Sequence, residues 1–455
     1  MLNILCSPCL PTMMIDMFKN TFKGGIHPYD GKDLSKDKPI KEMLPGPELV
    51  FPLSQHIGAP AEAIVKKGDS VLAGQMIAKA AGFVSAPVYS SVSGTVKALE
   101  KRRTITGDMA MSIVIENDGK YEKAAPLHQL KYVDMSREDK IRIIGEAGIV
   151  GMGGAGFPTH VKLSPKEPDK IDTVIVNCAE CEPYLTSDYR KMLEEPEKLI
   201  QGLEIEVSLF KNARGVLAVE DNKPDCIKLL REKTEGNEKI SVVALKTKYP
   251  QGSERQLIYA VTRREINSKM LPADAGCVVN NVDTVISICD AIMSGEPLTH
   301  RIVTVTGDAI KEPQNFKVLT GTNYNDLIEA AGGFKEEPAK IISGGPMMGF
   351  AMFDTNVPVT KSSSALLCMT KDEVAMYEPS ACINCGRCVD VCPSRLVPSV
   401  LADHAEHFNE EEFKALYGLE CVECGSCSYV CPAKRQLVQS IKTMRKICLA
   451  KRKKA

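Results

Sequence analysis

Short stretches of alternating apolar and polar residues, typical of β-strands, run through residues 47–125. Turn signals such as Lys67-Gly68-Asp69 and Ala73-Gly74-Gln75 separate them. The strands that this pattern predicts are Ala63–Val65, Met76–Ala78, Gly94–Ala98 and Ser112–Glu116. We therefore expect a small β domain, preceded by an N-terminal arm over residues 1–46 that is rich in Pro, Gly and Lys.

Strand-like and helical patterns alternate in residues 136–300, which favours an α/β layer. Strands are predicted at Asp172–Val176, Gly215–Val219 and Ile240–Leu245, and helices at Asp225–Lys233 and Glu254–Arg264. Residues 301–360 return to β patterning, with a strand at Ile302–Thr306 and a short helix at Asn325–Ala331. The expected fold class is multidomain α/β plus β, with a helical, cysteine-rich domain over residues 365–440.

Composition and charge narrow the class of protein. The chain has 455 residues, 44% of them hydrophobic, which is enough for several cores. Its 57 basic residues balance 58 acidic ones, so the sequence lacks the basic excess of a nucleic-acid-binding protein. No apolar run is long enough for a transmembrane helix. The N-terminus lacks the basic start of a signal peptide, Met17 is a candidate natural start, and Cys6 and Cys9 are interpreted as incidental thiols.

Eight of the 17 cysteines form two groups of four near the C-terminus, Cys382, Cys385, Cys388 and Cys392, then Cys421, Cys424, Cys427 and Cys431. Each group has the spacing C-x2-C-x2-C-x3-C-P, which is typical of [4Fe–4S] clusters. Without an export signal the thiols are expected to stay reduced, which favours cluster binding over disulfides. Two structural zinc sites are the alternative, but this duplicated spacing is unusual for zinc.

In ferredoxins with two clusters, the fourth cysteine of each motif binds the other cluster. Cluster one would then be bound by Cys382, Cys385, Cys388 and Cys431, and cluster two by Cys421, Cys424, Cys427 and Cys392. Gly386 and Gly425 lie where the backbone must pass close to a cluster.

A glycine-rich segment supplies a second chemical signal. Its four glycines, within six residues, are Gly151, Gly153, Gly154 and Gly156. A backbone without side chains can lie close to a planar ring or a phosphate and present N–H groups to it. A strand-like run at residues 174–177 then leads to Glu180 and Glu182, and α/β sheets bind ligands at the carboxyl ends of their strands. A tight loop and a solvated acidic turn are the plainer interpretations.

These two segments, GMGGAGFPTHVK and NCAECEP, resemble the flavin- and NADH-binding subunit of respiratory complex I. The resemblance implies FMN contacts from Gly151, Gly153, Gly154, Gly156, Lys162, Asn177 and Glu180. It places Phe157 and Glu182 beside the nicotinamide of NAD(H). Less specific matches add Gly252, Glu254, Asn281 and Thr284 to the flavin site. Met152 and Ala179 stand where that family has Arg and Asp.

Two further segments resemble known domains. Residues 65–99 resemble a biotinyl/lipoyl-type barrel-sandwich, but Ala80–Phe83 occupies the tip where carrier domains have a lysine, so we expect a structural or docking role. Residues 303–334 resemble a soluble-ligand-binding β-grasp domain.

The order of these domains, with TFKGGIHP at residues 21–28 and SGGPMMG at residues 343–349, resembles the C subunit of the Rnf ion-translocating ferredoxin:NAD oxidoreductase complex. That family implies a peripheral subunit on the cytoplasmic side of the cell membrane. It implies electron exchange between NAD(H), FMN and two [4Fe–4S] clusters, coupled in partner subunits, including an iron–sulfur subunit, to Na⁺ or H⁺ transport.

Two other functions remain open from sequence. The first is a soluble flavin and iron–sulfur reductase, such as a cobalamin reductase of diol utilisation, which resembles the same family and has the same layout. The second is a non-enzymatic electron-wire subunit without nucleotide binding, which Met152 and Ala179 permit. Residues 441–455 form a basic tail in which Ile441, Met444 and Cys448 would share one helical face. This tail is interpreted either as a frayed terminus or as a segment that docks on an anionic surface.

Overall fold

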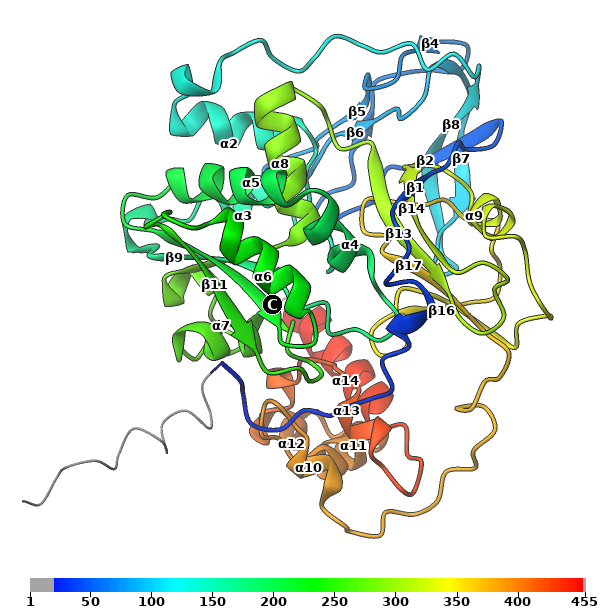
Figure 1. Cartoon of the computed structure of the whole chain (residues 1–455). Helices are drawn as coiled ribbons and strands as arrows, with labels where there is room; N and C mark the ends of the chain where they lie inside the picture. Colours follow the sequence, from blue (N-terminus) through cyan, green and yellow to red (C-terminus); the bar gives the residue numbers. More distant parts are fainter. Residues whose placement is uncertain (1–19, 453–455) are drawn as a thin grey trace, which may run out of the picture.

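The computed structural model describes residues 20–452. Met17, Cys6 and Cys9 lie outside the described residues. Mixed sheets and helices confirm a multidomain α/β plus β architecture (Figure 1). Among the helices of the described part, none is long and apolar enough to span a membrane. Short 3₁₀ turns link the larger elements, at η2 (Lys32–Leu34), η3 (Tyr132–Asp134), η4 (Pro168–Lys170), η5 (Pro272–Ala275) and η6 (Gly418–Glu420).

The first β region packs two small antiparallel sheets around one apolar core. One sheet has the order β2-β8-β7-β4 and the other β3-β5-β6. Their strands are β2 (Glu48–Pro52), β3 (Glu62–Ala63), β4 (Ser70–Val71), β5 (Met76–Lys79), β6 (Val88–Tyr89), β7 (Gly94–Arg103) and β8 (Met109–Asn117). The loop after β5 ends in an exposed tip that contains Phe83. The Phe83 ring lies edge-on to the His160 ring, with 5.7 Å between the ring centroids, beside the glycine-rich segment. The tip thus contacts the next domain.

The central sheet is four-stranded and parallel, with the order β11-β10-β9-β12. Its strands are β9 (Thr173–Cys178), β10 (Arg214–Glu220), β11 (Ile240–Leu245) and β12 (Cys277–Asn281). Apolar side chains on both faces enter separate cores, because helices cover the sheet on both sides. These helices are α2 (Arg137–Glu146), α3 (Thr159–Lys162), α4 (Ser187–Glu194), α5 (Pro196–Ser208), α6 (Pro224–Lys233), α7 (Glu254–Thr262) and α8 (Val282–Ser294).

A mixed sheet with the order β1-β14-β13-β17-β15-β16 follows, with α9 (Tyr324–Ala330) beside it. Its strands are β1 (Lys41–Glu42), β13 (His300–Thr306), β14 (Gln314–Leu319), β15 (Lys340–Ser343), β16 (Phe350–Met352) and β17 (Ala365–Met369). The N-terminal arm contributes β1, which pairs in parallel with β14 through Lys41 and Phe316. The arm is therefore built into the fold.

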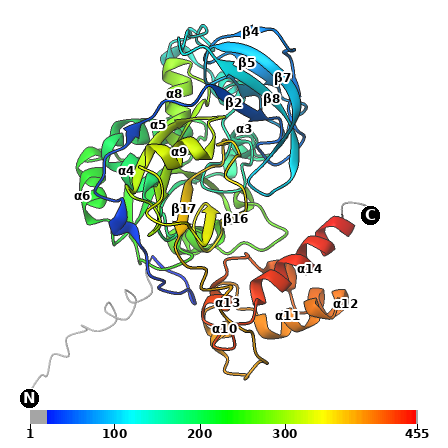
Figure 2. The ribbon, with the colours of Figure 1, turned by 90° about the vertical axis from the view of Figure 1, so that its right-hand side faces the viewer.

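The C-terminal helices form a lobe below the other domains (Figure 2). They are α10 (Arg387–Asp390), α11 (Pro398–Glu406), α12 (Glu410–Ala415), α13 (Ser426–Tyr429) and α14 (Leu437–Arg452). Ile441, Met444 and Cys448 are all buried in the core of this lobe. The segment interpreted as a tail from residue 441 is thus helical through Arg452, and its apolar face packs into the core of this lobe.

Candidate electron-transfer site

Two cavities in the C-terminal lobe are each lined by four cysteines. One is lined by Cys382, Cys385, Cys388 and Cys431, and the other by Cys392, Cys421, Cys424 and Cys427. The structure therefore brings together the crossed sets, with the fourth cysteine of each motif facing the three of the other. Among the described residues, no three His, Cys, Asp or Glu side chains are arranged to hold a single metal ion.

The two cysteine loops repeat the same backbone geometry. Gly386 and Gly425, at the starts of α10 and α13, have φ of +76° and +79°. Asn384 and Glu423, two residues before each glycine, have φ of +54° and +58°. Left-handed residues at matching positions curl each loop around its cavity, and glycine takes this conformation without strain. Four thiols around each cavity are the donor set that a [4Fe–4S] cluster requires.

The two cavities differ in their access to solvent. Cys382 and Cys385 of the first are exposed, whereas Cys424 and Cys427 of the second are 8% exposed. The second cavity faces the central α/β domain, because the Tyr249 hydroxyl donates to the Cys424 carbonyl at 2.8 Å. The second site is thus the inner one and the first the outer one.

The glycine-rich segment forms an open loop before α3. The Gly151 N–H donates to the Phe157 carbonyl at 2.7 Å, which closes the base of the loop. Gly153 has φ of +75°, and a Cβ there would lie 3.0 Å from Asn281 Nδ2. A Cβ at Gly154 would meet no atom within 4 Å. The exposed tip of the loop therefore offers bare backbone beside open space, as close approach by a planar ring requires.

Polar side chains from the ends of β9 and β12 gather beside this loop. Thr284 Oγ1 accepts from the Met152 N–H at 3.0 Å, which ties the loop to α8. Asn177 Nδ2 donates to the Gly252 carbonyl at 2.8 Å. Lys162 Nζ donates to the Val279 carbonyl at 3.0 Å and lies 3.7 Å from Glu254 Oε1. A cation, amides and bare backbone N–H groups in one place are chemistry that fits an anionic flavin nucleotide.

Glu180 is buried at the start of α4. Its side chain is 2% exposed, and its carboxylate accepts from the Asp188 N–H at 2.7 Å and the Tyr189 N–H at 3.3 Å. It therefore binds the first turn of α4, where N–H groups lack partners within the helix. Burial raises the pKa of Glu180, while Lys32 and Lys223 oppose that rise. Glu180, for which the resemblance implies an FMN contact, thus binds the start of α4.

Glu182 is held by the mixed sheet. Its Oε1 accepts from the backbone N–H groups of Met347 and Met348, at 2.7 and 3.0 Å. Burial raises the pKa of Glu182 to about 6, and these two hydrogen bonds oppose the rise. Glu182, which the resemblance places beside the nicotinamide, thus binds the backbone of the SGGPMMG segment.

Asp188 is a buried group that sequence inspection missed. It accepts from Asn281 Nδ2 at 2.6 Å, and a Cβ at Gly153 would lie 3.0 Å from that same nitrogen. Burial raises the pKa of Asp188 to about 7, with further contributions from the nearby Glu180 and Asp283. Asp188 fixes the orientation of the Asn281 amide, so it supports the loop from behind. Its place in the first turn of a helix gave no signal in the sequence.

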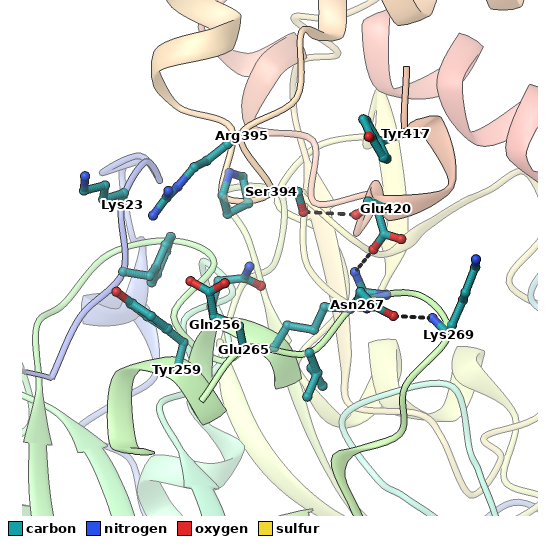
Figure 3. A pocket seen from close by; sticks show the side chains of 14 residues that line it. Lys23, Gln256, Tyr259, Glu265, Asn267, Lys269, Ser394, Arg395, Tyr417 and Glu420 are labelled. Carbon is teal, nitrogen blue, oxygen red and sulfur yellow. Dashed lines mark hydrogen bonds and ion pairs between the residues drawn. The ribbon is translucent and has the colours of Figure 1, made fainter. Parts of the chain in front are cut away.

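A cleft of about 480 Å³ separates the central domain from the C-terminal lobe (Figure 3). Glu420 joins its two walls, because it accepts from Arg255 at 2.9 Å and from the Ser268 N–H at 2.7 Å. Pro393 and Ser394 line both this cleft and the inner cysteine cavity. No sequence motif indicated this cleft, which exists only because two distant segments meet.

Family models match four parts of the chain. They are described as the RnfC barrel sandwich hybrid domain at residues 20–120, the Nuo51 FMN-binding domain at residues 144–290, the SLBB domain at residues 302–351 and the 4Fe-4S dicluster domain at residues 381–435. The FMN-binding match contains the glycine loop and Glu182, and the dicluster match contains all eight cysteines of the two cavities.

Curated relatives resemble the chain over nearly its whole length. The C subunit of the proton-translocating ferredoxin:NAD(+) oxidoreductase complex of Clostridium ljungdahlii is 49% identical over 428 residues, covering 93% of each chain. This chain belongs to the RnfC family. The C subunit of the Na(+)-translocating complex of Acetobacterium woodii is 46% identical over 437 residues, covering 95% of this chain and 98% of that protein. The C subunit of the ion-translocating oxidoreductase complex of Rhodobacter capsulatus is 40% identical, and the match covers 86% of this chain and 76% of that protein.

Membership of the RnfC family confirms the function and cofactors expected from the resemblance. The chain is an electron-transfer subunit of an ion-translocating ferredoxin:NAD(+) oxidoreductase, with FMN, NAD(H) and [4Fe–4S] clusters as its cofactors. It is one of several subunits that form a larger complex. This assignment favours the Rnf interpretation over the cobalamin reductase and the electron wire.

A solved structure shares the fold. The NAD⁺-reducing [NiFe]-hydrogenase in its H₂-reduced state aligns with a TM-score of 0.50 and 16% identity, over 70% of this chain and 65% of that chain. At this identity the likeness concerns the fold alone.

Proposed function

We propose that this subunit is the NAD(H) end of its complex and lies peripherally on the cytoplasmic side of the cell membrane. In this position it exchanges electrons with an iron–sulfur subunit, while other subunits move Na⁺ or H⁺. The observation that carries the proposal is the presence, in one chain, of an open glycine loop and two cavities of four cysteines each. NAD(H) exchanges two electrons at once and each cluster exchanges one, so a protein that joins them needs both kinds of site.

The proposed domains follow the sequence boundaries. They are an arm (1–46), a barrel-sandwich (47–125), a Rossmann-like FMN and NAD(H) domain (136–300), a β-grasp domain (301–360) and a ferredoxin-like domain with two [4Fe–4S] clusters (365–440). Family matches at residues 144–290 and 381–435 support the third and the last. The helix that runs to Arg452 supports extending the last domain beyond residue 440.

The chain's own groups would hold the flavin as follows. The bare backbone of Gly153 and Gly154 would give the flavin room to approach, and Lys162 would supply a positive charge nearby. Asn177 and Asn281 present amides from the ends of β9 and β12, with Asn281 fixed by Asp188. FMN, when bound, accepts electrons in pairs from NADH and releases them singly. Phe157 would lie against the nicotinamide, as the resemblance implies.

Three measurements on the purified chain test this function. We expect about eight iron and eight sulfide per chain, following from two cubanes. We also expect one FMN per chain and loss of flavin absorbance when NADH is added under nitrogen. A chain that carries clusters but takes up no FMN, and whose absorbance NADH leaves unchanged, would have to be an electron wire instead.

A further inference from the structure

The SGGPMMG segment, between β15 and β16, is packed tightly against the end of the central sheet. A Cβ at Gly345 would lie 2.2 Å from Glu182 Cγ, and one at Gly349 would lie 2.4 Å from the Gly345 carbonyl oxygen. The Gly349 N–H donates to that same carbonyl at 2.9 Å. Any larger residue at these positions would displace Glu182 or the loop backbone, so the close approach of the loop to Glu182 requires glycine.

Glu182 fixes the centre of this loop. Its Oε1 accepts both the Met347 and the Met348 N–H, and hydrogen bonds to a carboxylate are among the stronger ones in proteins. Glu182 therefore holds the backbone from which the Met347 side chain extends.

Met347 reaches the inner cluster site. Its Cε would lie 3.4 Å from a Cβ at Gly425, the glycine that follows Cys424. Met347 also belongs to a packed apolar group of eight residues, Ile26, Cys181, Tyr249, Met347, Val391, Val422, Cys424 and Val430. A thioether is flexible and polarisable, which suits it to filling an irregular gap between two domains.

The other side of this apolar group reaches the flavin site. Cys181 follows β9 and lies between Glu180 and Glu182 in sequence. Its Sγ accepts from the Gly252 N–H at 3.2 Å, and the Gly252 carbonyl accepts from Asn177. Tyr249 closes the group by donating to the Cys424 carbonyl. A continuous packed path therefore connects the expected flavin contacts to a cysteine of the inner site.

We propose that this group, which we call the Met347 contact, is the electron-transfer contact between the flavin domain and the inner cluster site, and that Glu182 is a positioning residue that holds Met347 in it. The inference rests on the proposed function. Two one-electron crossings, with one proton from solvent, balance NAD⁺ + 2e⁻ + H⁺ → NADH, and the same count holds in reverse. Glu182 then acts through the loop and does not bind the nicotinamide.

Four variants of the full chain, loaded with FMN and clusters, test the proposal. Glu182→Ala removes the acceptor, and Glu182→Gln keeps an oxygen that can accept both N–H groups. Met347→Ala removes the side chain, and Met348→Ala is the matched control, because Met348 is adjacent in sequence but 49% exposed. Iron and flavin contents are first compared with those of the wild type. If Met347→Ala loses iron, the two Glu182 variants carry the test.

Two rates are measured after rapid mixing with NADH, the loss of flavin absorbance and the appearance of the reduced-cluster EPR signal. In Glu182→Ala and Met347→Ala we expect an unchanged flavin rate and an unchanged KM for NADH. Their cluster signal should appear about tenfold to a hundredfold more slowly, as expected for small misplacements of reacting groups. Glu182→Gln and Met348→Ala should behave as the wild type does.

The opposite pattern would overturn the proposal. If both Glu182 variants raise the KM for NADH while the clusters follow the flavin without delay, Glu182 contacts the nicotinamide. The proposal would also be refuted if the reduced-cluster EPR signal appeared equally fast in Met347→Ala and Met348→Ala. Failure of the proposed function is distinguishable, because NADH would then leave even the wild-type flavin oxidised. The contact would still be tested by photoreducing the clusters and following the flavin.

Discussion

Ile441→Ala tests whether α14 belongs to the cluster-binding lobe. Ile441 is 1% exposed and lines the inner cavity with its four cysteines. Truncation to alanine removes three buried carbons, at about 0.8 kcal/mol each. The space left behind raises the cost to about 3–4 kcal/mol, within the usual range for such substitutions. Water would also gain access to one wall of the inner cluster site.

Ile447→Ala is the matched control, because the same truncation is made on the same helix at a half-buried position. Its cost should be about 1 kcal/mol, since less apolar surface is lost. The iron-loaded chains are heated while far-UV circular dichroism reports helix loss and EPR reports each cluster. We expect Ile441→Ala to lower the midpoint of thermal unfolding of the lobe by roughly 12–32 °C, and Ile447→Ala by about 4–8 °C.

Two outcomes would refute the reasoning. If the variants lower the midpoint equally, α14 does not pack by the face that contains Ile441. If neither changes it, and deletion of residues 441–455 leaves both clusters intact, the segment is a separable tail. Selective loss of the inner cluster in Ile441→Ala would support the burial of this helix.

Three other predictions follow from the site. Cys392→Ser should remove the inner cluster and spare the outer one, and an EPR spectrum lacking only the outer signal would contradict the crossed sets. Gly154→Val should leave thermal stability unchanged, because a Cβ at this position meets only open space. The valine would occupy the space proposed for the flavin, so FMN content should fall at least about tenfold. One FMN per chain in this variant would place the flavin elsewhere. Burial lowers the pKa of Lys361 in the folded chain to about 7. In the unfolded chain a lysine has its ordinary pKa of ~10.4. Between these two pH values the unfolded chain therefore binds one more proton than the folded chain does. The free energy of unfolding should therefore rise with pH across this window, by up to about 4–5 kcal/mol more than in Lys361→Met, and parallel pH profiles in urea unfolding would disprove it.

The sequence alone determined the features that depend on local spacing. A cubane needs four thiolates at fixed short intervals, so the two C-x2-C-x2-C-x3-C-P motifs identified the cysteines before any fold was known. Closely spaced glycines likewise mark bare backbone wherever they occur. Apolar runs predicted β9, β10 and β11 to within a few residues, because strands buried on both faces of a parallel sheet are apolar throughout.

Tertiary structure decided which way each polar side chain turns and what covers it. Glu180 and Glu182 are two residues apart, yet one binds the first turn of α4 and the other binds a loop about 165 residues away. Local pattern does not encode such a choice, because it depends on which distant N–H groups lack partners. The same holds for β1 pairing with β14, and for the burial of the helix that ends the described chain. Spacing along the chain thus predicted the cluster ligands, and packing between distant segments decided which of these cysteines line the same cavity.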